Sequence, residues 1–261
     1  MDQIDQLRQR AIESLGAEVM ALGGHAPGSA EIDRPGVRAA VTPAAAERSL
    51  FNSVYYSDPV ALAEALPDLE RVYERAGVRA WTVWVPDQDR ATAALLAERG
   101  HTLDGSPRAM SFWLEELAEP APAPDGVERD EAGTWPLVGR LNDAAYGYGE
   151  PAFEAAFVEP GAAPVAWSLA RVGEEPVACL GTVPNGDDVL VTAVATLPQW
   201  QGRGIASWLL HTALERAREA GARSASLRAS KAGAPIYARL GFQDHGFVEL
   251  WEYRRQGTGG A

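Results

Sequence analysis

The fold of this chain is decided by one stretch of sequence, Val194-Ala195-Thr196-Leu197-Pro198-Gln199-Trp200-Gln201-Gly202-Arg203-Gly204-Ile205-Ala206. The apolar run at 189–195 predicts a strand, and the residues from about 204 to 220 have the apolar spacing of a helix. Glycines lack Cβ atoms, so an anion can approach the backbone between the two elements, where the first helical turn offers unpaired N–H groups and a positive dipole. The stretch therefore predicts a site for a phosphate group.

The spacing of the glycines distinguishes this site from two common phosphate-binding motifs. A nucleoside-triphosphate loop ends in Gly-Lys-Ser or Gly-Lys-Thr, and a dinucleotide fingerprint has three spaced glycines after its strand. The sequence at 199–206 matches neither pattern. Another kind of phosphate-bearing ligand is therefore expected.

The residues around this stretch predict alternating helices and strands. The elements expected in the C-terminal half are a helix at 135–146, a hairpin of strands at 165–172 and 177–183, a strand at 189–195, a helix at 204–220 closed by Gly221, a strand at 224–229, a short helix at 235–240 and a strand at 247–254. This order predicts a domain of the α/β (α+β) class.

Two motifs resemble those of a known family. Gln201 to Ala206 resembles the acetyl-CoA motif of the GNAT superfamily of N-acetyltransferases, Gln/Arg-x-x-Gly-x-Gly/Ala. The frame from Gln199 to Gly204 also fits, but the first frame is preferred because the family's helix begins at the second glycine position. Further along, Ile236-Tyr237-Ala238-Arg239-Leu240-Gly241-Phe242 is similar to the family's Tyr-x-x-Leu-Gly-Phe segment. The resemblance covers about 127–255.

The resemblance implies a GNAT fold, with a mixed central sheet flanked by helices, and acetyl-CoA as cosubstrate. No metal is expected, because the sequence contains no evident cluster of metal ligands. The sheet would splay between the strands at 189–196 and 224–229, so that the pantetheine arm lies in the gap. Direct attack of a primary amine on the thioester would transfer the acetyl group, with no covalent enzyme intermediate. The implied contacts to acetyl-CoA are Val194, Ala195, Thr196, Gln201, Gly202, Arg203, Gly204, Ile205, Ala206, Ser207 and Ser230.

Three of the implied site residues have alternative interpretations. Tyr237 would protonate the departing thiolate, since a phenol still carries its proton near neutral pH, but it could also be a core aromatic. Ser230 stands where many relatives have an asparagine that touches pantetheine, and a helix N-cap suits it equally well. Arg203 would meet either a CoA phosphate or solvent.

The acceptor side of the site is less defined by sequence. No general base is identified, because Asp187, Asp188 and Glu249 are expected to be surface charges. The histidines 25, 101, 211 and 245 are expected to be structural. The aromatic residues that would form the acceptor wall, with a core role expected for at least half of them, are Tyr146, Tyr148, Phe153 and Phe157.

The two halves of the chain resemble each other. Gly77 to Trp81 followed by 97–101 parallels Gly221 to Ala225 followed by 238–242, and both halves then have an aromatic strand, at 110–114 and 247–253. This similarity predicts a tandem duplication. The expected domains are 1–118, a Pro-rich linker at 119–126, a GNAT domain at 127–255 and a flexible tail at 256–261.

The N-terminal half lacks the features that would bind CoA. Leu96 stands at the position that matches Tyr237, and 57–69 contains no Gly-x-Gly turn. We therefore expect a degenerate acetyltransferase lobe that packs on the active one, although an independent interaction domain remains an alternative. Residues 1–22 predict an amphipathic helix, whose expected core contacts are Ile4, Leu7, Ile12, Leu15 and Val19.

Composition limits the partners. The formal net charge of −13 disfavours nucleic acid and anionic membranes and favours a cationic amine. The sequence has no apolar run long enough for a membrane span and no signal-peptide pattern, so a cytoplasmic monomer or homodimer is expected. The rival functions are a CoA-binding sensor or scaffold without turnover, and an acyltransferase that uses a longer acyl-CoA.

Overall fold

The computed structural model describes residues 2–119, 122–148, 151–159 and 163–255. Residues 120–121 of the expected linker and the expected tail at 256–261 lie outside the described residues.

Among the described residues, twelve strands form one continuous sheet. Along the sheet they follow the order β1-β2-β3-β4-β12-β6-β11-β10-β9-β8-β7, and β5 pairs with β12 beside this path. The strands are β1 (Ala30–Arg34), β2 (Val37–Val41), β3 (Ser53–Tyr56), β4 (Ala80–Pro86), β5 (Thr102–Gly105), β6 (Arg108–Trp113), β7 (Val127–Asp130), β8 (Ala166–Val172), β9 (Glu175–Asn185), β10 (Asp188–Thr196), β11 (Ser224–Ala229) and β12 (Gln243–Arg254).

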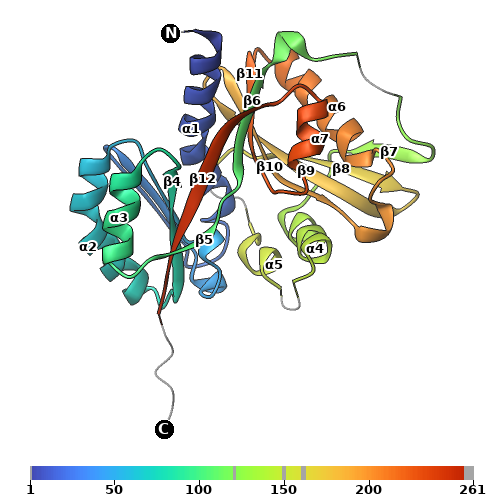
Figure 1. Cartoon of the computed structure of the whole chain (residues 1–261). Helices are drawn as coiled ribbons and strands as arrows, with labels where there is room; N and C mark the ends of the chain where they lie inside the picture. The colour runs from blue at the N-terminus through green and yellow to red at the C-terminus, as the bar shows by residue number, and fades with distance from the viewer. Residues whose placement is uncertain (1, 120–121, 149–150, 160–162, 256–261) are drawn as a thin grey trace.

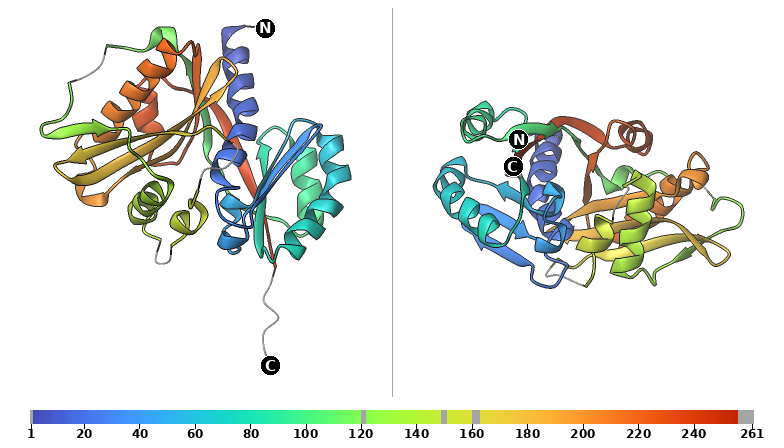
Figure 2. Two further views of the ribbon diagram at one scale, coloured as in Figure 1. Left: turned by 180° about the vertical axis from the view of Figure 1, so that it is seen from behind. Right: turned by 90° about the horizontal axis from the view of Figure 1, so that it is seen from below.

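Helices cover both faces of this sheet, as the views of Figure 2 show. The α-helices are α1 (Gln3–Leu22), α2 (Pro59–Arg75), α3 (Arg90–Glu98), α4 (Trp135–Tyr146), α5 (Phe153–Ala156), α6 (Ile205–Glu219) and α7 (Ala234–Arg239). The predicted mixed sheet flanked by helices is therefore confirmed. In the C-terminal half, α6 packs on one side against β8, β9 and β10, while α4 packs against β9 and β10 with a separate set of core residues.

The two halves exchange strands where they meet. β6 belongs to the N-terminal half of the sequence, but it pairs with β11 through the register Ser224↔Trp113 to Ala229↔Arg108. β12 begins beside β6, at Gln243↔Ser111, and then continues into the N-terminal sheet, where Val248 to Arg254 pair with β4. Figure 1 shows β12 running from one half to the other. Each half therefore contains a strand that is distant from it in sequence.

Helix α1 also joins the halves. It packs against β6, β10 and β11 on one side of the junction and against β2 and β3 on the other. Leu7, Leu15 and Val19 are buried as expected and Ile12 is partly buried, but Ile4 is 61% exposed, so its predicted core contact is wrong. Ile4 lies in the first turn of α1, which has fewer neighbours to bury it. One core cluster includes residues of α1 and of both halves.

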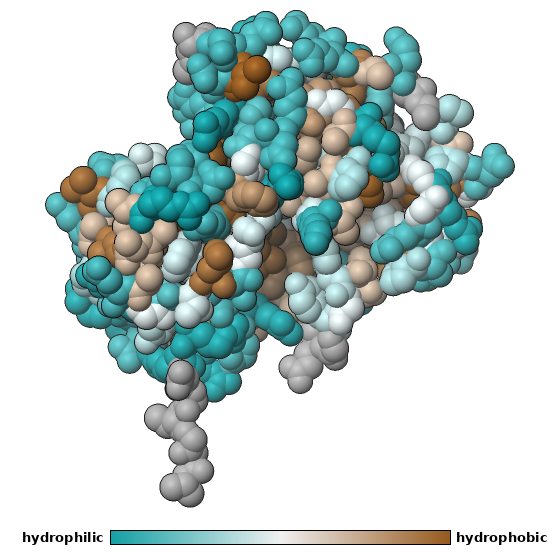
Figure 3. Space-filling view, in the orientation of Figure 1, coloured by the Kyte–Doolittle hydropathy of each residue, from teal (hydrophilic) through white to brown (hydrophobic). Residues whose placement is uncertain are grey.

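The sheet splays next to α1. β10 and β11 are parallel neighbours from Asp188↔Ser224 to Val191↔Leu227, and no further pair joins them within these described strands. The register between β10 and β9 shifts between Thr192 and Ala195, and Ala193 has φ of 49°. This β-bulge turns the second part of β10 away from β11. The predicted gap between these strands is therefore present, and Figure 3 shows apolar residues in the hollow between the two halves.

Candidate active site

The turn before α6 has the geometry of an anion site. Gly202 and Gly204 have φ of 74° and 78°, and a Cβ at either position would meet no described atom within 4 Å. The first α6 hydrogen bond is donated by the Trp208 N–H to the Gly204 carbonyl, at 3.0 Å. The N–H groups of residues 205–207 therefore precede the helical hydrogen bonds and face an open space at the positive end of the helix.

Polar contacts attach this turn to the end of β10. The side-chain amide of Gln201 donates to the Thr196 carbonyl at 3.1 Å. The Arg203 guanidinium lies 4.5 Å from the centre of the Trp200 ring and donates to the Gln199 carbonyl at 3.2 Å. Arg203 is thus exposed but held at the turn, where its charge can meet a phosphate.

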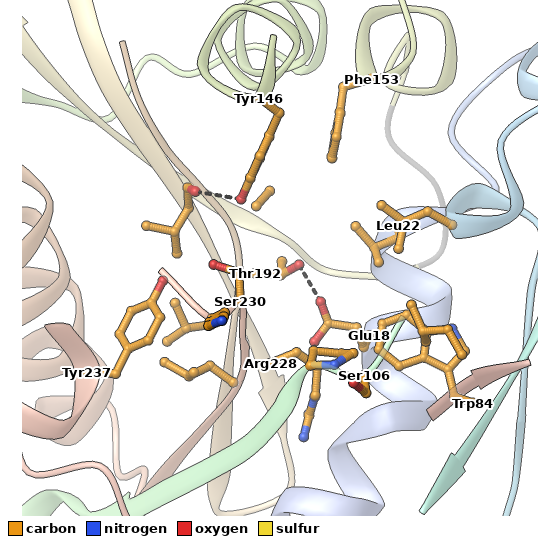
Figure 4. A pocket seen from close by; sticks show the side chains of 18 of the residues that line it. Glu18, Leu22, Trp84, Ser106, Tyr146, Phe153, Thr192, Arg228, Ser230 and Tyr237 are labelled. Carbon is orange, nitrogen blue, oxygen red and sulfur yellow. Dashed lines mark hydrogen bonds and ion pairs between the residues drawn. The ribbon is translucent and has the colours of Figure 1, made fainter. Parts of the chain in front are cut away.

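A cavity of about 500 Å³ opens at the splay and is lined by both halves of the chain. Val194, Ser230 and Tyr237, three of the sequence-predicted site residues, line it together. Ser230 and Tyr237 are labelled in Figure 4. Glu18 of α1 and Trp84 of β4 line it from the other side. β10 runs from this cavity to the glycine turn, so one strand connects the two parts of the site.

Tyr237 lies in the cavity wall. Its ring meets Phe242 edge to face, with centroids 6.0 Å apart, and Figure 4 shows its hydroxyl directed toward β10. Burial raises the pKa of the Tyr237 phenol well above its usual range. The phenol therefore stays protonated at neutral pH and holds a proton beside β10.

The bulge in β10 places the main chain of Val194 at the cavity. Its carbonyl accepts a hydrogen bond of 3.1 Å from the Tyr146 hydroxyl. Ala195 and Thr196, in contrast, are paired with Cys179 and Ala178 of β9. Of the three strand residues expected to contact acetyl-CoA, Val194 is thus the one outside the β9 pairing and next to the cavity.

The four aromatic residues of the expected acceptor wall divide into two groups. Tyr146, Tyr148 and Phe153 line the cavity, while Phe157 is fully buried among Trp135, Phe153 and Trp167. Three of them thus face the cavity, although Phe153 is also part of the core cluster.

Ser230 lies in the turn before α7, but the N-cap of that helix is Gly233, so an N-cap role for Ser230 is wrong. Its hydroxyl oxygen accepts a hydrogen bond from the Gly233 N–H at 3.1 Å, which stabilises the entry to α7. The same side chain lies at the cavity. Ser230 thus supports the turn and lines the cavity, while its contact with pantetheine stays a prediction.

Two of the three expected surface carboxylates are buried, so that expectation is wrong for them. Asp188 is 2% exposed and accepts from the Ser224 hydroxyl at 2.6 Å, because it opens β10 rather than lying in the turn. Glu249 is buried under Arg90 and accepts from the Trp251 indole at 2.9 Å. Asp187 is half-exposed and pairs with Arg10 at 2.5 Å.

The histidines lie outside the cavity lining. His25 stacks on Trp135 with centroids 3.9 Å apart, and His101 is buried against Trp81. His211 contacts the Ala118 carbonyl at 2.5 Å, and His245 contacts the Ser111 hydroxyl at 2.9 Å. These packing contacts fit structural roles.

Glu18 is a cavity residue that sequence reasoning missed. It is 5% exposed, in α1, and its carboxylate accepts from the Thr192 hydroxyl of β10 at 2.8 Å. A signal was available, since Glu18 lies three residues after Leu15 and four before Leu22 and so falls on the apolar stripe of the helix. A carboxylate on such a stripe must find a buried polar partner.

Within the described part of the chain, no three His, Cys, Asp or Glu residues are grouped so that they could hold a metal ion. No helix among the described residues is long and apolar enough to cross a membrane.

Comparison with known proteins agrees with this architecture. Residues 165–244 match the family model described as "Acetyltransferase (GNAT) domain", so this part of the chain carries a GNAT domain. A search of curated proteins finds no match.

Solved structures share the fold over nearly the whole chain. A GCN5-related N-acetyltransferase from Kribbella flavida has a TM-score of 0.65 at 17% identity and covers 97% of both chains. A GCN5-related N-acetyltransferase from Sphaerobacter thermophilus has a TM-score of 0.57 at 18% identity, with 94% of this chain and 92% of that chain covered. A tandem GNAT protein from the clavulanic acid biosynthesis pathway has a TM-score of 0.56 at 13% identity, covering 96% and 95%. The GNAT-like fold thus extends over both halves.

Proposed function

We propose that this protein is an N-acetyltransferase that moves an acetyl group from acetyl-CoA to a primary amine by direct attack. The observation that carries this proposal is the continuity of the site along β10. The strand leads from the glycine turn, where the CoA pyrophosphate would bind, to the cavity that holds Val194 and Tyr237. A phosphate site and a proton donor at the two ends of a splayed strand suit a thioester of CoA.

In the proposed reaction, the neutral amine attacks the acetyl carbonyl while the Val194 N–H stabilises the developing oxyanion. The new C–N bond forms and the C–S bond breaks. The departing thiolate takes a proton from Tyr237, and the resulting phenolate takes back a proton from the nitrogen. The products are the amide and CoA, and the protein supplies positioning and proton transfer.

The acceptor would enter from the side where the two halves meet. Leu50 and Trp84 of the N-terminal half line the same cavity as Tyr237. The degenerate lobe would therefore supply part of the acceptor wall. The net charge of −13 favours the approach of a cationic amine.

Isothermal titration with acetyl-CoA tests the cofactor site. We expect micromolar binding to the wild type and at least a 100-fold loss in Gly204→Glu, because the new carboxylate would occupy the turn and repel the pyrophosphate. Gly173→Glu is the matched control, since Gly173 also has positive φ, at 58°, and open space around it, but lies in the β8–β9 turn. Equal binding by both variants would contradict the assigned phosphate site.

A thiol-release assay with an amine library then tests turnover. Binding of acetyl-CoA without release of CoA by any amine would support the sensor or scaffold instead. Faster release of CoA from a longer acyl-CoA than from acetyl-CoA would show that the donor is the longer acyl-CoA. No binding by the wild type would overturn the enzyme assignment.

A further inference from the structure

Glu18 presents a buried carboxylate to the cavity. Its Oε1 accepts from the Thr192 hydroxyl at 2.8 Å, while its Oε2 accepts no hydrogen bond from any residue that the structure describes. The nearest cation to Oε2 is the Nε of Arg228, at 3.7 Å, which is longer than a hydrogen bond. One carboxylate oxygen therefore has capacity left for a ligand that donates N–H groups.

Arg228 directs its hydrogen bonds elsewhere. Its two terminal nitrogens donate to the Ala11 carbonyl and to the Ser14 hydroxyl, both in α1. Arg228 also interacts electrostatically with Asp188. Arg228 thus provides a nearby positive charge for the buried Glu18 carboxylate. It does not form a bidentate salt bridge, which would use both carboxylate oxygens.

The walls around Glu18 are largely apolar. Leu22, Leu50, Trp84 and Leu250 line the cavity on the side of the N-terminal sheet. Figure 4 shows Phe153 above Leu22 and Trp84. Tyr237 lies on the opposite side (Figure 4), and Val194 also lines the cavity. A ligand between the two sides would meet a carboxylate and apolar surface together. This combination suits a single amino group on an apolar body.

We propose that Glu18 binds the ammonium group of the acceptor and accepts the proton that it must lose, and that the acceptor is a monoamine with an apolar, aromatic-sized body. This inference rests on the proposed acetyl transfer. One N–H bond of the ammonium breaks and its proton moves to the Glu18 carboxylate. The freed lone pair attacks the thioester as described above, and Glu18 releases its proton to solvent after the product leaves.

The electrostatic surroundings suit this role. Burial raises the pKa of Glu18, even though Arg228 on β11 and the Thr192 hydroxyl on β10 act to lower it. Tyr146 and Tyr237 also face Glu18 across the cavity, and Lys231 lies in the cavity lining. A base must be unprotonated to act, so kcat/KM should fall as the pH drops through the raised pKa of Glu18.

The main experiment compares Glu18→Gln with the wild type, using acetyl-CoA and 2-phenylethylamine. We expect unchanged affinity for acetyl-CoA, a kcat/KM at least about 100-fold lower, and loss of the acidic limb of the pH profile. Glu13→Gln, an exposed position on the same helix, should match the wild type. If Glu18→Gln stays within threefold of the wild type and keeps its acidic limb, the role of Glu18 is wrong.

A second variant covers the case in which Glu18→Gln does not fold beside the buried Arg228. Thr192→Val removes one hydrogen bond to the charged carboxylate, which should raise the pKa of Glu18 further. The acidic limb should therefore move to higher pH, whereas a purely structural Glu18 would leave it in place. An unmoved limb in a folded Thr192→Val variant would overturn the proposal.

An amine panel tests the substrate class. The ratio of kcat/KM should favour 2-phenylethylamine over putrescine and glucosamine by at least about tenfold, because the apolar wall would desolvate a second charge or several hydroxyls without pairing them. A preference for putrescine or glucosamine would contradict the apolar acceptor. If the wild type binds no acetyl-CoA and no amine releases CoA, the proposed acetyl transfer itself is wrong. That outcome is distinct from failure of the Glu18 proposal, in which acetyl transfer is retained.

Discussion

The helices α2 and α6 occupy equivalent places in the two halves but begin in different ways. Each follows a strand and leads to a parallel neighbour, with Ser53↔Thr82 joining β3 to β4 and Asp188↔Ser224 joining β10 to β11. At α2, the carboxylate of Asp58 accepts from the Val60 N–H at 2.8 Å and from the Ala61 N–H at 3.4 Å. The donors at this helix end are already used by a negative side chain.

At α6, no described side chain caps the first turn, and Gly204 at the N-cap leaves the space open. An external anion can therefore take the place that Asp58 fills at α2. The strand ends differ as well, because the Tyr56 hydroxyl donates to Asp89 at the start of α3 at 2.6 Å, whereas the end of β10 borders the cavity. A few side chains thus separate a helix start that is open to an anion from one that its own carboxylate already caps.

Tyr237→Phe should give the largest effect in this comparison. Loss of the proposed proton donor should lower kcat about 100-fold while acetyl-CoA affinity stays within threefold, because the phenol would act on the thiolate formed during the reaction. Steady-state kinetics and titration on the same preparation measure both. Tyr253→Phe, on β12 beside Trp81, is the control and should behave as the wild type. A kcat within threefold in Tyr237→Phe would leave Tyr237 as a packing residue.

Leu50→Ala should have a smaller effect, which tests whether the N-terminal half helps to bind the acceptor. We expect KM for 2-phenylethylamine to rise about threefold to tenfold, because several methyl and methylene groups leave the cavity wall. The affinity for acetyl-CoA should not change. Leu103→Ala removes an exposed leucine of the same half and should leave KM unaltered. If both variants keep the wild-type KM, the acceptor does not contact Leu50.

Asp58→Ala should have the smallest effect and should be limited to stability. Loss of the cap should cost about 1 kcal/mol and lower Tm by about 2–4 °C. Titration should still give one acetyl-CoA per chain, because the turn before α2 lacks the two glycines. Glu64→Ala, an exposed change within α2, should leave Tm nearly unchanged. A second molecule of acetyl-CoA bound by Asp58→Ala would show that the Asp58 carboxylate alone prevents acetyl-CoA from binding at the start of α2.

Local sequence patterns were enough to predict most elements of the C-terminal half. The strand expected at 224–229 is observed as Ser224–Ala229, and the helix expected at 204–220 is observed as Ile205–Glu219. Both depend on short-range causes, namely the period of apolar residues and the positive φ that Gly204 and Gly221 adopt at the ends of the helix.

The tertiary structure alone determined how the halves are joined and what lies across the cavity from Tyr237. The exchange of β6 and β12 depends on which strand edges meet, and the periodicity of either strand does not encode its neighbour. Glu18 and Thr192 form a hydrogen bond although they are 174 residues apart in sequence. Asp188 and Glu249 are buried for the same reason, because their cover comes from distant segments. The sequence by itself thus determined the glycine turn before α6, which is local, while the position of the Glu18 carboxylate in the cavity wall required the folded chain.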